Sequence, residues 1–341
     1  MTTALEIASV GMVTSVGLDA PSACAAMRAG IDGFQETHFL SGPDEALIGA
    51  PIPLPRGWIG EKRFAHLAAG AICEALQEVP EARREAVVIL CLPEESRPGR
   101  PVRDVRALVR SILEIAEVPQ SARLLKVSHG RPSGHVALEQ ARRILAANEA
   151  PFVLIAGVDS YLTTHAVEHY LAKRRLLTLS NPDGFIPGEA AAAILCTKAG
   201  PGRFSLFGLG LSREKSFIYN EEDIPLRGDG IVEAYRGALN QTGIEMNGLG
   251  YRISDLIGEA YFFKQTALAS IRLVRGHHGF QDLWSPAESL GNVGASVVPL
   301  MIGMAWTAAR KGYAAGNPVL VEASNDQGAC GAAVFGVGAI Q

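Results

Sequence analysis

The pattern that most constrains this chain is a unit of helix, Xaa-Pro, apolar strand and polar turn, which occurs twice. The first copy runs from a helical pattern at 134–150 through a proline into the apolar run 152–157. The second runs from a helical pattern at 294–316 through another proline into the apolar run 319–323. Apolar residues at helical spacing predict the helices, and short apolar runs behind a proline predict buried strands. Two such units about half a chain apart indicate an internal duplication.

Strand-length apolar runs alternate with helical patterns elsewhere too, because a helical stretch at 63–76 is followed by the apolar run 86–92. This alternation predicts an α/β fold with layers of helices on sheets. The 341 residues, 48% of them apolar, suffice for two fused halves,. We predict a division into 1–200 and 201–341.

Composition excludes several classes of function. The 31 basic and 35 acidic residues give a net charge of −4, which leaves no basic stripe for nucleic acid,. Apolar runs are shorter than the roughly 18 residues that a membrane span needs, so we expect a cytoplasmic protein without membrane contact. The five cysteines form no CxxC pair and no glycine-rich phosphate loop occurs, so we predict neither a metal nor a cofactor,.

Several segments, in order, resemble the β-ketoacyl-(acyl carrier protein) synthases of the thiolase superfamily. The motif DGFIPGEA at 183–190 is similar to the family's DGFxxGEGA segment and is the most specific of them. The stretch 131–160 is similar to the family's nucleophile helix and the strand behind it, and 291–295 resembles the start of a histidine-bearing helix. Weaker likenesses lie at 11–17, 25–31 and 325–331, whereas 201–255 matches poorly.

This resemblance implies a thiolase-like, duplicated five-layer α-β-α-β-α sandwich with its active site where the two halves meet. It also implies association, as a homodimer or as a heterodimer with an active ketosynthase-like subunit, through the edge strand before Arg131. An unpaired apolar edge would otherwise recruit other strands. An acyl carrier protein is a further candidate partner.

The residues that the family uses for catalysis are replaced here. Family members attack an acyl thioester with a cysteine at a helix N-terminus, which favours the thiolate. Two histidines then assist decarboxylation of the malonyl extender. The resemblance places Arg131 at the cysteine, and Glu259 and Asn292 at the histidines. Arginine cannot lose its proton in a protein, so no nucleophile stands there. We expect no condensing activity, and a buried Arg131–Glu259 salt bridge that fills the former pocket.

Three functions stay open. The first is a catalytically degenerate ketosynthase-like protein, similar to chain-length-factor subunits, which acts as partner subunit, scaffold or accessory factor in fatty-acid or polyketide-type acyl metabolism. The second is an acyltransferase or acyl-thioester-binding enzyme with a relocated nucleophile or base. Its candidate residues are Cys330, Ser128, Ser133, His129 and His135. The third is a binding module for an unrelated ligand. Ser133 also has a structural interpretation, as the cap of a helix that begins at Gly134.

Overall fold

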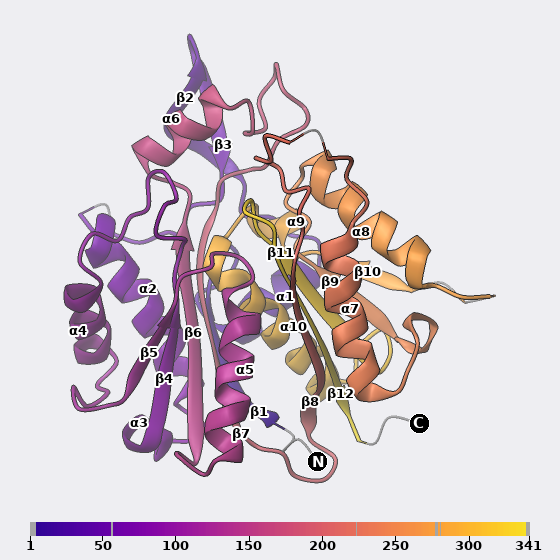
Figure 1. Cartoon of the computed structure of the whole chain (residues 1–341). Coiled ribbons are helices and arrows are strands. Elements are labelled where there is room, and N and C mark those ends of the chain that lie inside the picture. The colour runs from indigo at the N-terminus through magenta and orange to yellow at the C-terminus, as the bar shows by residue number, and fades with distance from the viewer. Residues whose placement is uncertain (1–4, 56, 223, 277–278, 280, 339–341) are drawn as a thin grey trace.

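The computed structural model describes residues 5–55, 57–222, 224–276, 279 and 281–338 (Figure 1). Up to residue 198 its elements are β1 (Leu5–Val13), α1 (Ala20–Arg28), β2 (Gln35–Gly42), β3 (Glu45–Gly49), α2 (Gly60–Ala75), α3 (Ala82–Glu85), β4 (Ala86–Cys91), α4 (Val105–Ile115), β5 (Leu124–Val127), α5 (Ser133–Ala146), β6 (Phe152–Ser160), α6 (Thr164–Ala172) and β7 (Glu189–Lys198). From residue 204 they are β8 (Phe204–Arg213), α7 (Asp229–Thr242), β9 (Tyr251–Ser254), α8 (Ala260–Leu273), β10 (Asp282–Trp284), α9 (Ala287–Leu290), α10 (Val297–Lys311), β11 (Val319–Ser324) and β12 (Ala329–Val337). Short 3-10 turns lie at Met246–Gly248 and Gly294–Ser296.

Ten strands form one mixed sheet in the order β10-β9-β11-β12-β8-β1-β7-β6-β4-β5. Read outward from the centre, β1-β7-β6-β4-β5 and β8-β12-β11-β9-β10 are two series with the same pairing directions. In both series the first three strands are antiparallel neighbours and the last three are parallel. The two apolar runs of the repeated sequence unit are β6 and β11, the middle strand of each series. A domain boundary at residue 200 stays a prediction.

Helices cover and separate the two series, so that five layers result (Figure 1). Helices α2 and α4 pack on the outer face of the first series, and α7 and α8 pack on the outer side of the second. Helices α5 and α10 lie between the series, in a core to which strands of both contribute. The expected α/β five-layer sandwich is therefore confirmed.

The alternation of side chains along β6 explains how one strand serves two layers. Val153 and Ile155 face the central core beside α5 and α10, whereas Leu154 and Ala156 face the outer core beneath α2. Because successive side chains of a strand point to opposite faces, a strand covered on both sides must be apolar throughout. This requirement produces the continuous apolar runs of the sequence.

Helix α5 fits tightly between its neighbours. Leu138, Ala141 and Leu145 are buried on one face, as the helical pattern predicts. A Cβ at Gly134 would lie 2.6 Å from Cβ of Val298, so glycine permits the close approach of α5 to α10,. The predicted cap was wrong: α5 begins at Ser133, and the Ser133 hydroxyl accepts a hydrogen bond from the backbone N–H of His129 instead.

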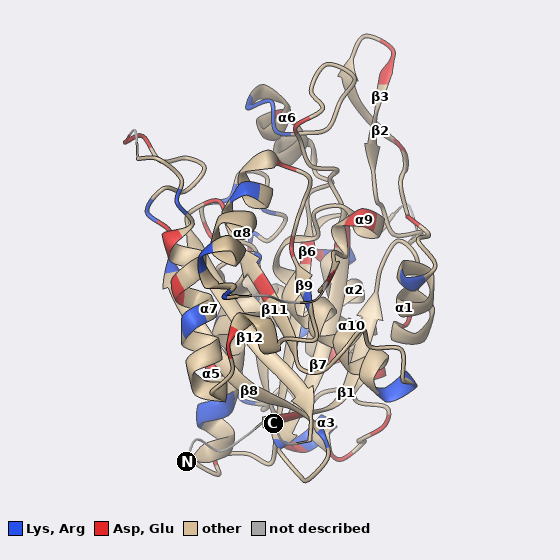
Figure 2. Cartoon of the chain, turned by 90° about the vertical axis from the view of Figure 1, so that its right-hand side faces the viewer, with Lys and Arg blue, Asp and Glu red and all other residues tan. Residues whose placement is uncertain are grey.

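Positive and negative residues alternate along the outer helices on one side of the molecule (Figure 2). Figure 2 shows lysine and arginine interspersed with aspartate and glutamate along the outer helices of the side in view. No helix within the described ranges is both long enough and apolar enough to cross a membrane.

Candidate functional site

Arg131 lies in the loop between β5 and α5, at the N-terminal end of that helix, and it is only 1% exposed. The preceding Gly130 has a φ of 61°, and a Cβ there would lie 2.1 Å from a carboxylate oxygen of Glu94. Because residue 130 is glycine, the loop can pass close to the Glu94 carboxylate. The guanidinium carbon of Arg131 lies 4.0 Å from the centre of the Phe262 ring, which covers it from one side,.

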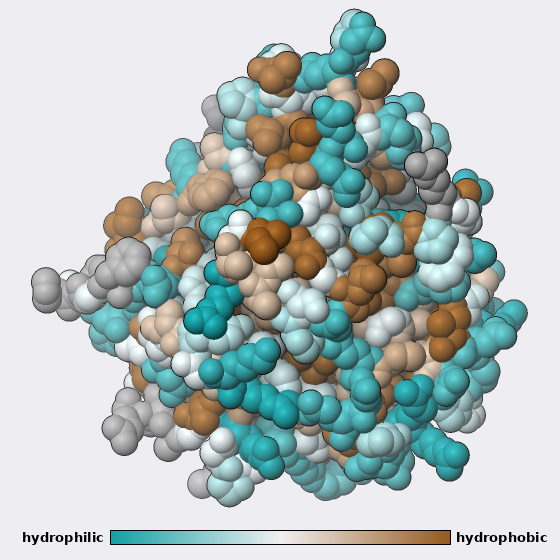
Figure 3. Space-filling model, turned by 180° about the vertical axis from the view of Figure 1, so that it is seen from behind, coloured by the Kyte–Doolittle hydropathy of each residue, from teal (hydrophilic) through white to brown (hydrophobic). Residues whose placement is uncertain are grey.

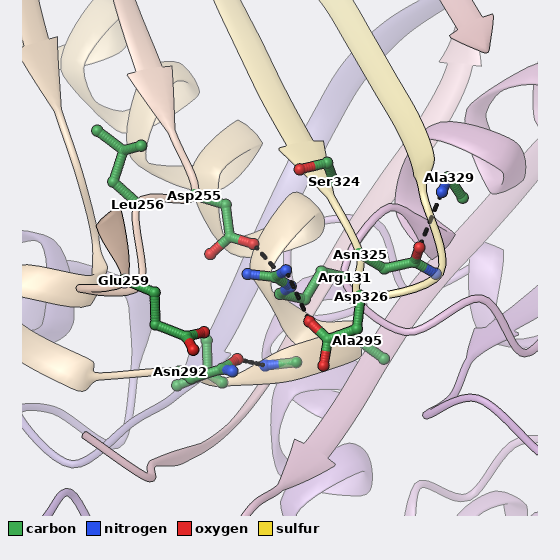
Figure 4. Close-up of polar contacts among 12 residues, drawn as sticks. Arg131, Asp255, Leu256, Glu259, Asn292, Ala295, Ser324, Asn325, Asp326 and Ala329 are labelled. Carbon is green, nitrogen blue, oxygen red and sulfur yellow. Dashed lines mark hydrogen bonds and ion pairs between the residues drawn. The ribbon is translucent and has the colours of Figure 1, made fainter. Parts of the chain in front are cut away.

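Two carboxylates bind Arg131 (Figure 4). Its Nε lies 3.5 Å from Oδ2 of Asp255, and its Nη2 lies 3.3 Å from Oδ1 of Asp326. The predicted Arg131–Glu259 salt bridge was therefore wrong. Asp255 directly follows β9 and so reaches Arg131, whereas Glu259, just before α8, is bound by a different arginine.

That second arginine is Arg175, which follows α6 and is held on both sides. Its Nε donates to Oε1 of Glu259 at 2.6 Å, and its Nη2 donates to Oε2 at 2.5 Å. Its Nη1 donates to Oδ2 of Asp326 at 2.6 Å and to the Tyr219 hydroxyl at 2.7 Å. Asp326 thus joins Arg131 and Arg175, and we call Arg131, Arg175, Asp255, Glu259 and Asp326 the ion network.

The ion network is nearly balanced in charge. Two guanidinium groups and three carboxylates give a formal charge of −1. Burial raises the pKa of Asp255 to about 6, although Arg131 opposes this rise. Burial also tends to raise the pKa of Asp326, but Arg175 and Arg131 together hold it below its usual range. Buried charges of this kind are stable only when they are paired, so each member fixes its neighbours.

A second buried ion pair lies beside the network. The Nη1 and Nη2 of Arg97 donate to the Asp159 carboxylate at 2.9 and 2.7 Å. That carboxylate also accepts a hydrogen bond from the backbone N–H of Ala295 at 2.8 Å. Asp159, in β6, therefore fixes the turn that leads into α10, and Arg97 neutralises it.

Asn292 is buried in that turn and has a structural role. Its side-chain oxygen accepts a hydrogen bond from the backbone N–H of Gly294 at 3.1 Å (Figure 4). Its backbone N–H and C=O bond to Ile186 and Gly188 in the DGFIPGEA segment. No hydrogen bond or ion pair among the described residues links the Asn292 side chain to Arg131 or Glu259.

Two carboxylates of the DGFIPGEA segment bind residues of neighbouring elements. Glu189 accepts hydrogen bonds from the backbone N–H of Ile52 at 2.8 Å and from the hydroxyl of Ser160 at 3.2 Å. The guanidinium group of Arg63 in α2 completes its set of partners. Asp183 accepts a hydrogen bond from the N–H of Ala260 at the start of α8. These carboxylates pin neighbouring elements to the sheet.

Three of the five candidate relocated groups lie in unreactive surroundings. Burial raises the pKa of the Cys330 thiol to about 12, so it stays protonated at neutral pH,. Burial lowers the pKa of His135 to about 4, and its Nε2 lies 3.1 Å from the carbonyl oxygen of Val321. The Ser133 hydroxyl is fully buried and bonded to the N–H of His129. Ser128 and His129 line an open cleft instead, where His129 is exposed and the Ser128 hydroxyl oxygen is buried.

Two clefts open beside the ion network. One of about 260 Å³ reaches Asp326, and the other, of about 410 Å³, reaches His129. Both are lined by Glu94, Ser96 and Gln327. Within the described ranges, no group of three or more His, Cys, Asp and Glu side chains is arranged to hold a metal ion.

Sequence reasoning missed Arg175, Asp255 and Asp326 as members of the site. A usable signal was present, because Asp255 directly follows the apolar strand β9, and Asp326 lies two residues after β11. Ligand and catalytic groups of α/β sheets gather beyond the carboxyl ends of the strands, so charged residues there are candidates for a shared site. Arg175 follows a helix and carries no such signal.

No protein-family model matches the chain, and no curated protein sequence matches it. Solved structures do. A structure titled the ishigamide ketosynthase/chain length factor is 15% identical, with a TM-score of 0.80, over 98% of this chain and 99% of that one. A ketosynthase in complex with its chain length factor from Xenorhabdus doucetiae is 14% identical, with a TM-score of 0.76, over 98% of both chains. A structure of a type II PKS acyl-carrier protein in complex with its ketosynthase is 14% identical, with a TM-score of 0.78, over 98% of this chain and 100% of that one. The chain therefore has the thiolase-like fold of ketosynthases and chain length factors.

Proposed function

We propose that this protein is a non-condensing, ketosynthase-like subunit that works as the partner of a catalytic ketosynthase-like chain in fatty-acid or polyketide-type acyl metabolism. The observation that carries this proposal is the burial and ion pairing of Arg131. A buried guanidinium group stands where the resemblance places the nucleophilic cysteine, and Asp255 and Asp326 hold it there. It cannot be acylated, and it occupies space that an acyl thioester would need.

The similar structures support a partner role. Two of them are described as containing a chain length factor together with a ketosynthase. A third holds an acyl-carrier protein, so we include such a carrier among the candidate partners. We place the protein in the cytoplasm, which agrees with five cysteines that are all free thiols,.

We propose that association uses β5, the outermost strand of the first series. Within the described ranges this strand pairs only with β4. Leu124 and Leu125 are half-buried on its two faces, so a second β5 strand could extend the sheet and cover them,. The partner would be a second copy of this chain or a catalytic relative of the same fold.

The test combines chemistry with association. The purified chain is incubated with acyl-carrier-protein and coenzyme A thioesters, and intact-mass spectrometry reads any covalent acyl group. We expect none, and no β-ketoacyl product. The chain is then co-expressed with a cysteine-containing ketosynthase from the same genome, and native mass spectrometry should give a one-to-one complex. An acyl adduct that disappears in Cys330→Ala would instead support the acyltransferase alternative.

A further inference from the structure

A cleft of about 440 Å³ lies at β10, the outermost strand of the second series. Its walls come from α1, β10, α9 and α10, and they include Met27, Arg28, Trp284, Glu288, Met304 and Tyr313. None of its lining residues belongs to the ion network. Figure 3 views the face on which α1 lies, where hydrophobic groups are set among hydrophilic ones. A volume of this size is in the range of small-molecule sites.

The wall of the cleft is aromatic and polarisable. The Trp284 indole packs against Tyr251, with ring centres 4.6 Å apart, which fixes its position. The Trp284 ring also faces the Tyr313 ring, with ring centres 6.5 Å apart and only 28° between the two planes. Met27 and Met304 complete the wall with flexible thioethers. Aromatic faces and methionine sulfur favour a flat, unsaturated ring over a bulky aliphatic group.

Arg28 supplies a cation that no carboxylate of the described residues pairs with. Its guanidinium carbon lies 4.3 Å from the centre of the Tyr313 ring. Four other described arginines lie on aromatic rings, and each has a carboxylate partner. These pairs are Arg97 with Asp159, Arg131 with Asp255, Arg175 with Glu259, and Arg310 with Glu78. Among the described residues Arg28 forms no such ion pair, although Glu288 lines the same cleft.

We propose that this cleft binds a small planar aromatic carboxylate. The ring would lie against Trp284 and Tyr313, and the carboxylate would complete the pair that Arg28 lacks. Arginine suits this role because its planar group can stack on a ring while its N–H groups donate to a carboxylate. Glu288 at the same cleft repels a second anionic group, so the site selects monocarboxylates over dicarboxylates.

The test is calorimetric titration of the full chain with 2-naphthoate. Two matched probes separate the contributions: 2-naphthamide keeps the ring and removes the charge, and cyclohexanecarboxylate keeps the charge and removes the aromatic face. We expect one-to-one binding of 2-naphthoate and binding at least about tenfold weaker for either analogue, since each lacks one of the two contacts. Quenching of tryptophan emission on titration would report contact with Trp284.

Variants locate the site. Arg28→Ala should weaken 2-naphthoate binding by about tenfold or more, because an exposed arginine without an ion pair is removed at little structural cost. Arg310→Ala is the matched control, since Arg310 likewise lies on an aromatic ring, that of Trp306, but is paired with Glu78. This variant should bind 2-naphthoate as tightly as the natural chain does. Glu288→Gln should bind 2-naphthoate equally well or more tightly. The proposal is overturned if the natural chain shows no saturable binding, if Arg28→Ala binds as tightly, or if the amide binds as well as the carboxylate.

Discussion

Arg175 binds Asp326 across 151 positions of the sequence, with Nη1 2.6 Å from Oδ2 and Nη2 3.2 Å from Oδ1. The other ion pairs of the network also join an arginine from the first part of the chain to a carboxylate from the second part. Both arginines of the ion network precede residue 200, and all three of its carboxylates follow it. The two halves of the chain therefore meet at the ion network through complementary charges. Because unpaired buried ions are costly, this arrangement penalises any misplacement of one series against the other.

Double-mutant cycles should distinguish the observed Arg175–Glu259 ion pair from the Arg131–Glu259 pair that the resemblance led us to predict. Glu259→Gln should lower the free energy of unfolding by about 3 kcal/mol, since it leaves Arg175 with one buried partner fewer. Combining it with Arg175→Met should show a coupling of about 1–3 kcal/mol, as expected for residues in direct contact. Urea unfolding of the two single variants and the double variant measures this. A larger coupling between Glu259 and Arg131 would contradict the network.

A cysteine introduced at residue 131, where the resemblance places the family's nucleophile, should not confer acyl chemistry. In Arg131→Cys the thiol would lie beside Asp255 and Asp326, with Glu259 and Asn292 at the positions where the resemblance places the two histidines. Two carboxylates raise a thiol pKa. We expect no covalent acyl group by intact-mass spectrometry after incubation with acyl thioesters. The variant should also lose about 3 kcal/mol of stability, because two buried carboxylates lose a cation. Arg131→Gln serves as the control for stability alone, and acylation of the cysteine variant would show that the site keeps catalytic capacity.

The fold was predictable because its determinants are local. The apolar runs that became β6 and β11 are continuous, since each of these strands is covered on both faces, and the helical pattern before each run became α5 and α10. The first residue of a helix was harder to predict, because a single hydrogen bond can decide where a helix begins. The hydroxyl of Ser133 bonds to the N–H of His129 in the loop rather than capping the helix,.

The partners of the buried charges were not predictable in the same way. The resemblance led us to expect Arg131 and Glu259 in one site, and both do join the ion network. Which carboxylate contacts which arginine depends on how segments more than 80 residues apart in sequence are placed in space. The Arg131–Glu259 pair was wrong because Asp255 lies closer to Arg131, and because Arg175 takes both oxygens of Glu259. No periodicity or motif records such choices.

Glu322 in β11 should make stability depend on pH. It is 2% exposed and interacts with the hydroxyl groups of Ser254 and Thr266, and burial raises its pKa to about 8. The folded chain therefore holds a proton that the unfolded chain releases above the ordinary glutamate pKa. The stability that this proton contributes is complete at acidic pH and is lost as the pH rises through about 8,.

The measurement compares the natural chain with Glu322→Gln, whose amide keeps the size of the side chain and cannot ionise. From pH 5 to pH 8 the natural chain should lose stability relative to this variant, by at most about 1.4 kcal/mol per pH unit. Urea unfolding at a series of pH values gives the difference, and contributions from the ion network cancel in it. A difference that stays constant over this range would mean that Glu322 is ionised in the fold.

Lys126→Pro should abolish the association that we propose at β5. The carbonyl oxygens of Arg123 and Val127 accept hydrogen bonds from β4, and backbone groups of a strand alternate in direction,. The N–H of Lys126 therefore faces the free edge, so proline at this position removes a donor for a second chain without removing one to β4. Light scattering coupled to gel filtration should give a dimer for the natural chain and for Lys126→Ala, and a folded monomer for Lys126→Pro. A natural chain that stays monomeric at micromolar concentration, without an added partner, would contradict homodimerisation through β5. The partner at this edge would then be a catalytic subunit of the same fold.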